Sequence, residues 1–151
     1  GTTYTDRGVV LKHNGNDKKL NYNFVNEPDL AQTFVVTVVI EYPFPFYRFA
    51  KSEDKETDRI EALKTELRKL GYLLTDSNNS ILEWNGERCE PQAHPVITTY
   101  EDHRMAMAFA PAALVLPEGI EIADPQVVSK SYPHYWRDLR TAGFIIIDNE
   151  Q

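Results

Sequence analysis

Cysteine is nearly absent from the 151-residue sequence, in which Cys89 is the only one. A single cysteine cannot form an intramolecular disulfide, and such scarcity is typical of a reducing compartment, so we expect a cytoplasmic location. Long hydrophobic runs are also missing, because no stretch approaches the roughly 18 apolar residues that a transmembrane helix needs. The start shows no signal-peptide pattern either. We therefore expect no membrane partner.

Positive charge is in the minority, with 16 Lys and Arg against 23 Asp and Glu and a formal net charge of -7. This balance argues against nucleic acid or an acidic membrane as the main partner. Histidine is scarce as well, and none of the histidines stands at metal-ligand spacing from Cys89, so we expect no metal site and no cofactor. The apolar content of 42% nevertheless predicts a globular domain with its own core.

The residue patterns predict a mixed fold of the α/β or α+β class. We expect strands at 7–13, 20–25, 43–50, 72–75, 80–84, 96–100, 118–122 and 144–148, and helices at 28–41, 55–70, 102–114 and 133–141. The strands at 7–13 and 20–25 should form a hairpin around Asn14-Gly15-Asn16-Asp17, and a second hairpin should join 72–75 to 80–84. The clearest helix is 55–70, which carries leucines on one face and is ended by Gly71.

The order of the predicted elements repeats along the chain. Residues 20–84 read strand, helix, strand, helix, strand, strand, and residues 96–148 read the same without the closing strand. We interpret 1–151 as a single-domain fragment, in which 20–84 is one complete unit, 96–148 is an incomplete last unit, and the hairpin within 1–25 ends a preceding unit. The missing strand would then come from elsewhere in a longer polypeptide.

Basic side chains stand at the amino-terminal ends of three predicted helices, where the helix dipole disfavours positive charge. They are Lys55 and Arg59 in one first turn, His103 and Arg104 in another, and Lys130 just before a third helix. A bound anion would reverse this unfavourable placement, because helix N–H groups and cationic side chains would hold it together. The pattern favours a small phosphorylated or carboxylated ligand, although surface pairing with neighbouring acids would explain any single case.

Four segments resemble motifs of the EPSP synthase family. They are Glu27-Pro28-Asp29-Leu30-Ala31-Gln32-Thr33, Lys55-Glu56-Thr57-Asp58-Arg59-Ile60 with EALKTELRKLG after it, Asp102-His103-Arg104-Met105-Ala106-Met107, and Val128-Ser129-Lys130-Ser131-Tyr132-Pro133. Their order and intervals fit the family over nearly the whole chain. The resemblance implies strand-helix-strand-helix-strand-strand units around buried helices, in an inside-out barrel of which about two units are present here. It also implies that the chain is the carboxy-terminal portion of a two-domain enzyme.

The resemblance implies an activity, the transfer of the enolpyruvyl group from phosphoenolpyruvate to the 5-hydroxyl of shikimate 3-phosphate with release of phosphate. Asp29 would be the general base toward that hydroxyl, and Glu56 would transfer a proton at the methylene carbon. The substrate-binding residues would be Arg59, Arg104 and Lys130 for phosphoenolpyruvate, Lys55 for shikimate 3-phosphate, and His103 in the pocket lining. No metal or cofactor is implied. The amino-terminal domain of the same polypeptide would complete the site, so the isolated chain should lack turnover.

Several alternatives remain open at this point. The UDP-N-acetylglucosamine enolpyruvyl transferases share the fold, and a non-catalytic anion-binding module could keep it. Asp29 could simply complement a helix dipole, and Glu56 with Arg59 could be a surface pair. Residues 38–54 also depart from the family pattern, because no glycine occurs between Gly15 and Gly71, whereas the family usually has a glycine-containing loop before the signature helix.

Overall fold

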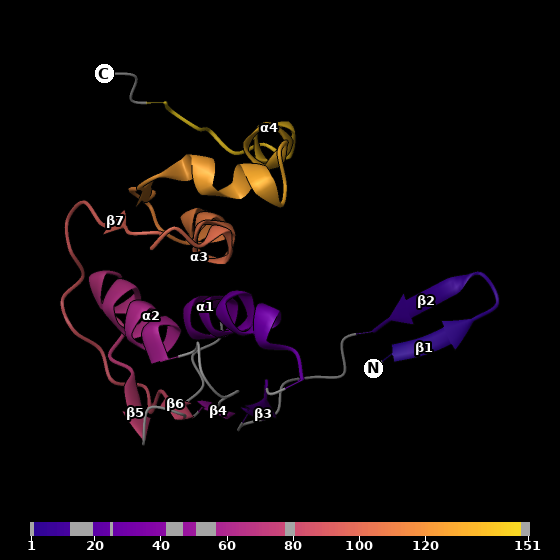
Figure 1. The fold of residues 1–151 in the computed structure, drawn as a ribbon, viewed down its shortest axis with the longest axis horizontal. Coiled ribbons are helices and arrows are strands. Elements are labelled where there is room, and N and C mark those ends of the chain that lie inside the picture. The colour runs from indigo at the N-terminus through magenta and orange to yellow at the C-terminus, as the bar shows by residue number, and fades with distance from the viewer. Residues whose placement is uncertain are drawn as a thin grey trace.

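The computed structural model of the protein describes residues 2–12, 20–24, 26–41, 47–50, 57–77 and 81–148. It is a mixed helix and strand fold, as predicted (Figure 1). The elements are, in chain order, β1 (Thr2–Thr5), β2 (Gly8–Leu11), β3 (Leu20–Asn23), the 3-10 helix η1 (Pro28–Leu30), α1 (Ala31–Glu41), β4 (Tyr47–Ala50), α2 (Thr57–Lys69), β5 (Thr75–Ser77), β6 (Ile81–Glu83), β7 (Val96–Ile97), α3 (His103–Phe109), the 3-10 helix η2 (Ala110–Leu114), β8 (Glu121–Ile122), the 3-10 helix η3 (Pro125–Lys130) and α4 (Tyr135–Thr141).

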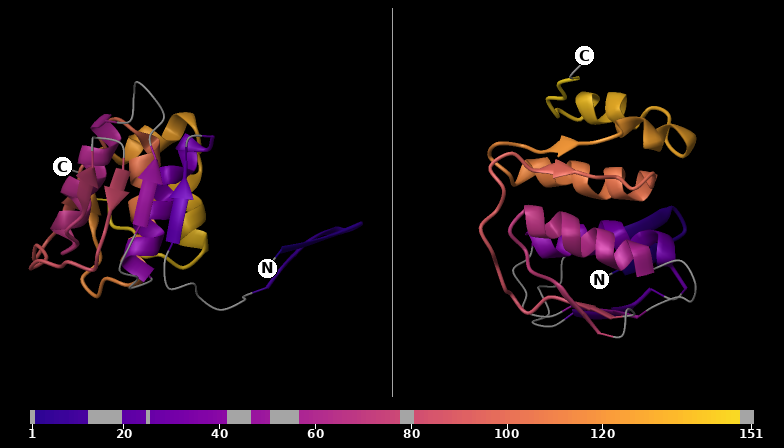
Figure 2. Two further views of the ribbon diagram at one scale, coloured as in Figure 1. Left: turned by 90° about the horizontal axis from the view of Figure 1, so that it is seen from below. Right: turned by 60° about the vertical axis from the view of Figure 1, so that its left-hand side comes forward.

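A four-stranded sheet forms the base of the molecule, in the order β3-β4-β6-β5. β3 and β4 are parallel, and β6 pairs antiparallel with both β4 and β5. A parallel pair needs a crossover connection, and α1 lies in the chain between β3 and β4. The element order β3, α1, β4, α2, β5, β6 is the order predicted for residues 20–84. Both helices cover the same face of the sheet (Figures 1 and 2).

Helix α1 is the centre of the core. Its valines at 35, 36, 38 and 39 are all buried, and the helix contacts both α2 and α3. β-branched residues favour strands by local preference, but a helix that is apolar on nearly all sides is stable when neighbours surround it. Burial between α2 and α3 therefore explains why this valine-rich segment is helical.

Helix α2 is amphipathic, with Ala62, Leu63 and Leu67 turned into the core. Gly71 follows it with a φ of +91°, and a Cβ at this position would lie 2.9 Å from the carbonyl oxygen of Cys89. Glycine is therefore needed here both for the left-handed backbone and for the close approach of the next segment. The prediction that Gly71 ends this helix is confirmed.

The second half of the chain stacks on the first. β7 and β8 form a short parallel pair, and α3 lies between them in the sequence and packs on α1. A smaller core, formed by Ala106, Ala110, Val128 and Tyr135, joins α3 to η3 and α4. The result is a succession of layers, from the sheet through α1 and α2 to α3 and then to α4 (Figures 1 and 2). No helix in the described ranges has both the length and the apolar character needed to cross a membrane.

The predicted hairpin between 7–13 and 20–25 is wrong. β2 pairs antiparallel with β1, with Thr5 opposite Gly8, whereas β3 pairs with β4. A two-residue connection at Asp6 and Arg7 lets the first strands meet locally, and this hairpin projects away from the other layers (Figures 1 and 2). The turn expected at 14–17 lies outside the described residues.

The predicted strand at 144–148 is also not formed, because this segment has no strand partner within the described part of the chain. A strand is assigned only where its backbone groups pair with a neighbour. Ile145 and Ile147 are 92% and 80% exposed, although both are large and apolar. α4 begins at Tyr135 rather than at Pro133, and 125–130 forms the unpredicted helix η3.

Candidate active site

Asp102 is the amino-terminal cap of α3. Its backbone is extended, and its side chain accepts a hydrogen bond from the backbone N–H of Arg104 at 2.9 Å. Aspartate is one of the residues preferred at this position, because its carboxylate satisfies an N–H group that the helix leaves unpaired. The prediction that Asp102 opens this helix is confirmed, and the cap fixes one oxygen of the carboxylate.

Arg104 joins two carboxylates that come from different helices. Its Nη2 atom lies 2.6 Å from Oδ1 of Asp29, and its Nη1 atom lies 3.4 Å from Oδ1 of Asp102. Asp29 is in η1, directly before α1, and its side chain is 68% exposed. The packing of α1 against α3 thus places the first turns of the two helices side by side.

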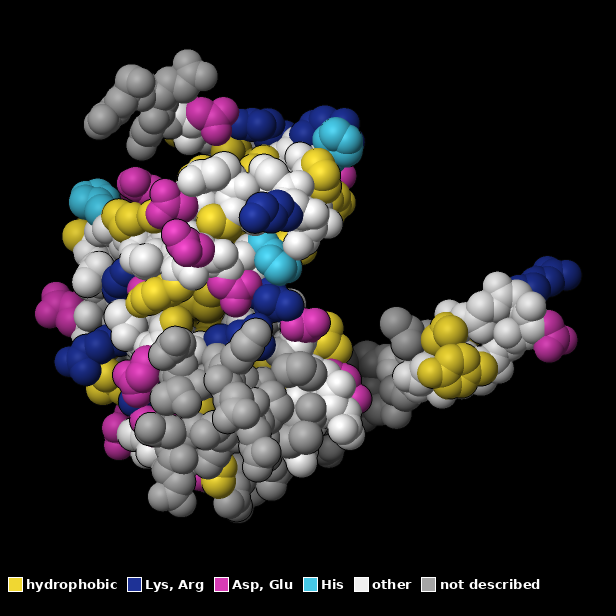
Figure 3. Space-filling model, viewed as in Figure 1, with side chains coloured by type: hydrophobic (Ala, Val, Ile, Leu, Met, Phe, Trp, Pro, Cys, Tyr) yellow, Lys and Arg dark blue, Asp and Glu magenta, His cyan; other side chains and the backbone are white. Residues whose placement is uncertain are grey.

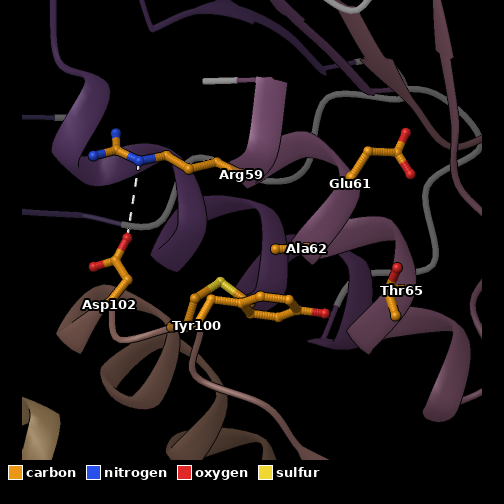
Figure 4. A pocket seen from close by; sticks show the side chains of 7 residues that line it. Arg59, Glu61, Ala62, Thr65, Tyr100 and Asp102 are labelled. Carbon is orange, nitrogen blue, oxygen red and sulfur yellow. Dashed lines mark ion pairs between the residues drawn. The ribbon is translucent and has the colours of Figure 1, made fainter. Parts of the chain in front are cut away.

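The second oxygen of Asp102 contacts α1 and α2. Gln32, one turn after Asp29 and fully buried, donates from Nε2 to Oδ2 of Asp102 at 3.2 Å. The Nε atom of Arg59 lies 3.8 Å from the same oxygen (Figure 4). Asp102 is therefore the point where three helices meet, and its carboxylate sets the relative positions of two arginines.

The arginines of the cluster have N–H donors left for an anion, although Asp29 and Asp102 balance their charge. Arg59 and Arg104 lie around Asp102, and Nδ1 of His103 is 3.8 Å from Oδ1 of Asp102. A guanidinium has five N–H donors, and the 3.8 Å separation of Arg59 from Asp102 is longer than a hydrogen bond. Both arginines therefore keep donors for a carboxylate or phosphate. Figure 3 shows basic, acidic and histidine side chains gathered beside a hollow in the surface.

A cavity of about 460 Å³ opens beside this cluster. Its lining consists of Arg59, Glu61, Ala62, Thr65, Tyr100, Asp102 and Met105 (Figure 4). Burial, and then the hydrogen bond that its hydroxyl donates to Glu66 at 2.8 Å, raise the pKa of Tyr100 to about 12. The phenol is protonated at neutral pH, as any tyrosine is, and donates to Glu66. Among the described residues no group of His, Cys, Asp or Glu is arranged to hold a metal ion.

Comparison with known proteins identifies the family. The model of the EPSP synthase (3-phosphoshikimate 1-carboxyvinyltransferase) family matches residues 13–139. The chain belongs to the EPSP synthase family. It is 61% identical over 152 residues to the 3-phosphoshikimate 1-carboxyvinyltransferase of Bacteroides fragilis strain YCH46, covering 99% of this chain and 37% of that protein.

More distant members of the family match as well. The enzyme of the same name from Nitrosomonas eutropha is 38% identical over 120 residues, covering 79% of this chain and 27% of that protein. The one from Idiomarina loihiensis is 32% identical over 141 residues, covering 91% and 31%. This EPSP synthase family chain thus spans little more than a third of the length of the Bacteroides fragilis relative, and its matches to the other two cover 27% and 31% of their lengths. The resemblance inferred from the four motifs is confirmed.

The structure brings together four of the seven residues that the family motifs single out, namely Asp29, Arg59, His103 and Arg104. Lys130 is exposed at the end of η3, which packs on α3, and within the described ranges it forms no ion pair or hydrogen bond with the cluster. Lys55 and Glu56 lie outside the described residues, as do 42–46 and 51–54 of the divergent segment. The chemical roles of all seven stay predictions.

Sequence reasoning did not identify Gln32 or Tyr100 as part of the site. Gln32 lies within the first family motif, and its spacing of three residues from Asp29 places both on one side of the chain as it enters α1. A glutamine in an otherwise apolar helix was the available signal. Tyr100 offered none, because its position depends on how the segment after β7 crosses α2.

Proposed function

We propose that this chain is the carboxy-terminal part of an enzyme that transfers the enolpyruvyl group of phosphoenolpyruvate to the 5-hydroxyl of shikimate 3-phosphate and releases phosphate. The observation that carries the proposal is the convergence of Arg59, Arg104, Asp29 and Asp102 from three helices. Membership of the EPSP synthase family supports it, as does the name of the relatives, 3-phosphoshikimate 1-carboxyvinyltransferase.

Phosphoenolpyruvate carries a planar carboxylate and a phosphate with three terminal oxygens. Guanidinium groups bind both kinds of anion through paired N–H donors. Arg59 and Arg104 supply such donors from the beginnings of two helices, whose dipoles add to the attraction. Lys130 supplies a third cation in the proposal. These fixed charges stabilise the negative charge that develops during addition and elimination, without reorganisation of solvent.

The reaction needs one group that accepts a proton and one that donates it. Asp29 is the general base for the 5-hydroxyl, and its ion pair with Arg104 holds the carboxylate in place. Glu56, directly before α2, handles the proton at the methylene carbon. Lys55 binds shikimate 3-phosphate, and His103 lines the pocket. Because Asp29 lies in η1 and Glu56 precedes α2 in the sequence, the two acids are proposed to act on different atoms of the same intermediate.

The proposed architecture extends the observed layers to the inside-out barrel of the family. Residues 20–84 are one complete unit, and 96–148 are a last unit that lacks a closing strand. The exposed Ile145 and Ile147 support a partner strand there, which the amino-terminal part of the polypeptide would supply. The amino-terminal domain would also complete the substrate site. The isolated chain should therefore show no turnover.

The test is phosphate release from phosphoenolpyruvate by the full-length enzyme that contains this chain. Shikimate 3-phosphate and UDP-N-acetylglucosamine are offered as acceptors in separate reactions. We expect release with shikimate 3-phosphate alone. Release with the nucleotide sugar would overturn the choice of acceptor, and release with neither would favour a non-catalytic anion-binding module.

A further inference from the structure

Glu66 is a fully buried carboxylate that the proposed reaction does not use. It lies on α2, two helical turns after Arg59, and is 0% exposed. An ionised carboxylate is costly to bury unless hydrogen bonds and an opposite charge compensate it. Its presence in the core therefore points to a specific set of neighbours.

Those neighbours belong to the segment that leads from β7 to α3. The Oε1 atom of Glu66 accepts from the Tyr100 hydroxyl at 2.8 Å. Its Oε2 atom accepts from the backbone N–H of Thr98 at 3.0 Å and from Nζ of Lys69 at 2.6 Å. Lys69 in turn donates to the carbonyl oxygen of Val96 at 2.8 Å. One ion pair, between the buried Glu66 and the partly exposed Lys69, thus contacts both β7 and the residues that follow it.

The segment held in this way contains an unfavourable turn. Tyr100 and Glu101 have φ angles of 53° and 58°, in the left-handed region that residues with a Cβ rarely adopt. Two consecutive residues in this region persist only where the surroundings impose the conformation. Glu66 contacts the chain just before the turn, at the Thr98 N–H, and the first residue of the turn, at the Tyr100 hydroxyl.

The turn positions Asp102 at the beginning of α3. The backbone N–H of Asp102 donates to the carbonyl oxygen of Thr99 at 2.9 Å, and the Asp102 carboxylate then caps α3 and lies beside Arg59. Figure 4 shows Tyr100 under α2 with its hydroxyl directed away from Asp102, on the side of Thr65. Helix α2 therefore contacts this segment twice: Glu66 bonds to Thr98 at its beginning, and Arg59 lies beside Asp102 at its end.

We propose that Glu66 is a positioning residue, whose buried carboxylate imposes the Tyr100-Glu101 turn and through it sets the direction of Asp102, Arg59 and Arg104. It is not one of the residues that line the cavity. Its effect on anion binding passes through Asp102, which contacts both arginines. The kinetic part of this inference rests on the proposed function, because it takes phosphoenolpyruvate as the anion.

The first variant is Glu66→Gln in the full-length enzyme. The amide keeps the shape but loses the charge that pairs with Lys69, and its nitrogen cannot accept the hydrogen bonds that Glu66 receives at that end. We expect the KM for phosphoenolpyruvate to rise about tenfold with kcat changed less than about twofold, the pattern of weakened uniform binding. Tyr100→Phe keeps the Glu66 charge and removes only the hydrogen bonds of the hydroxyl, with Glu66 and with Thr65. It should act in the same direction, and it serves if the first variant does not fold.

The matched control is Asp76→Asn. Asp76 also ties α2 to another segment, through Lys64, but it lies on β5 and leads to no part of the site. It should lower the unfolding temperature without moving the KM for phosphoenolpyruvate. A KM equal in Glu66→Gln and Asp76→Asn would overturn the inference and leave Glu66 with a structural role only.

A second measurement decides the inference independently of turnover. Amide hydrogen exchange at Arg104, within the peptide that covers 98–106, should accelerate about tenfold or more in Glu66→Gln, because this N–H loses its acceptor when Asp102 moves. Asp76→Asn should leave this peptide unchanged. Unchanged exchange in Glu66→Gln would overturn the inference even in a protein that releases no phosphate. Accelerated exchange in that protein would support the inference and count against the proposed function alone.

Discussion

Gln32 donates a hydrogen bond from Nε2 to Oδ2 of Asp102 across 70 positions of sequence. The bond joins the beginning of α1 to the cap of α3. Asp29 lies in η1, directly before α1, and Arg104 lies in the first turn of α3. The Asp29–Arg104 pair and the Gln32–Asp102 pair therefore close a ring across two helices. A change at any member of the ring should alter the direction of the others.

Replacement of Gln32 by leucine should change the KM for phosphoenolpyruvate but hardly change the unfolding free energy. Loss of the hydrogen bond to the carboxylate should lower the unfolding free energy by about 1.5–3 kcal/mol. In the parent, the buried Oε1 of Gln32 has no hydrogen-bond partner within the described ranges, and its removal should restore about 1–3 kcal/mol. These terms nearly cancel, so the unfolding free energy should change by less than about 1.5 kcal/mol.

The KM for phosphoenolpyruvate should nevertheless rise about tenfold in Gln32→Leu, because Asp102 loses a donor that directs its carboxylate. Steady-state kinetics and urea unfolding of the full-length enzyme measure the two effects. The control is leucine at the exposed Gln92, which should change neither. An unchanged KM together with a large loss of stability would contradict the expectation.

Replacement of Arg104 by lysine should weaken anion binding although the charge is kept. Arg104 reaches Asp29 and Asp102 with two different nitrogens, and a single ammonium cannot reproduce this fork. The KM for phosphoenolpyruvate should rise between about tenfold and a hundredfold, or about 1.4–2.7 kcal/mol of lost binding. Arg140→Lys is the control, because Arg140 pairs with Asp148 on the surface away from the cluster. Equal kinetics in the two variants would refute the assignment of Arg104.

The sequence predicted elements well where the signal was local. Helix 28–41 was predicted and forms as η1 and α1, and helix 55–70 was predicted from its leucines and Gly71 and forms as α2. The first hairpin was wrong because a strong turn signal at Asn14-Gly15 does not determine which strands meet. The observed pairing of β3 with β4 is a contact across the whole of α1.

Of the site, only the residues to which the family motifs assign a role were predicted from the sequence. Asp29, Arg59, His103 and Arg104 were named from the sequence, and the structure brings them together. The Gln32–Asp102 bond was not predictable, because it depends on the packing of α1 against α3. The strand expected at 144–148 depends on a neighbour that no local pattern can supply.

Glycine at position 71 should be essential for stability, and Gly86, which has a similar backbone conformation, provides the comparison. Both have nearly the same φ, +91° and +92°, but a Cβ at Gly71 would lie 2.9 Å from the Cys89 carbonyl oxygen, whereas at Gly86 it would meet nothing within 4 Å. Gly86→Ala should therefore cost about 1 kcal/mol, the strain of the left-handed backbone alone.

Gly71→Ala should cost at least about 2 kcal/mol more than Gly86→Ala, because backbone atoms on both sides must shift. Chemical denaturation of the two alanine variants, followed by the fluorescence of the buried Trp84, measures the difference. Equal losses in the two variants would show that the chain between Gly71 and Cys89 yields easily, and would remove close approach as the reason for this glycine.

Tyr135 should make the protein less stable as the pH rises above 10. Burial raises the pKa of Tyr135 to about 12 from its ordinary value of 10.0, and its hydroxyl donates to the Met107 carbonyl oxygen at 3.1 Å. Between these two pKa values the unfolded chain releases the phenolic proton while the folded protein keeps it. The unfolding free energy should therefore fall with pH, by up to about 1.4 kcal/mol per unit from this group.

The Tyr135→Phe variant tests whether the unfolding free energy falls with pH because of this group. The variant loses the hydrogen bond at every pH, and so should be less stable than the parent at pH 8 by about 1 kcal/mol. It should lose less stability than the parent between pH 10 and 11.5, so the two curves converge. Urea unfolding across this range provides the measurement. Parallel curves would show that Tyr135 ionises alike in the folded and unfolded protein, and that the contact between α4 and α3 leaves its hydroxyl open to water.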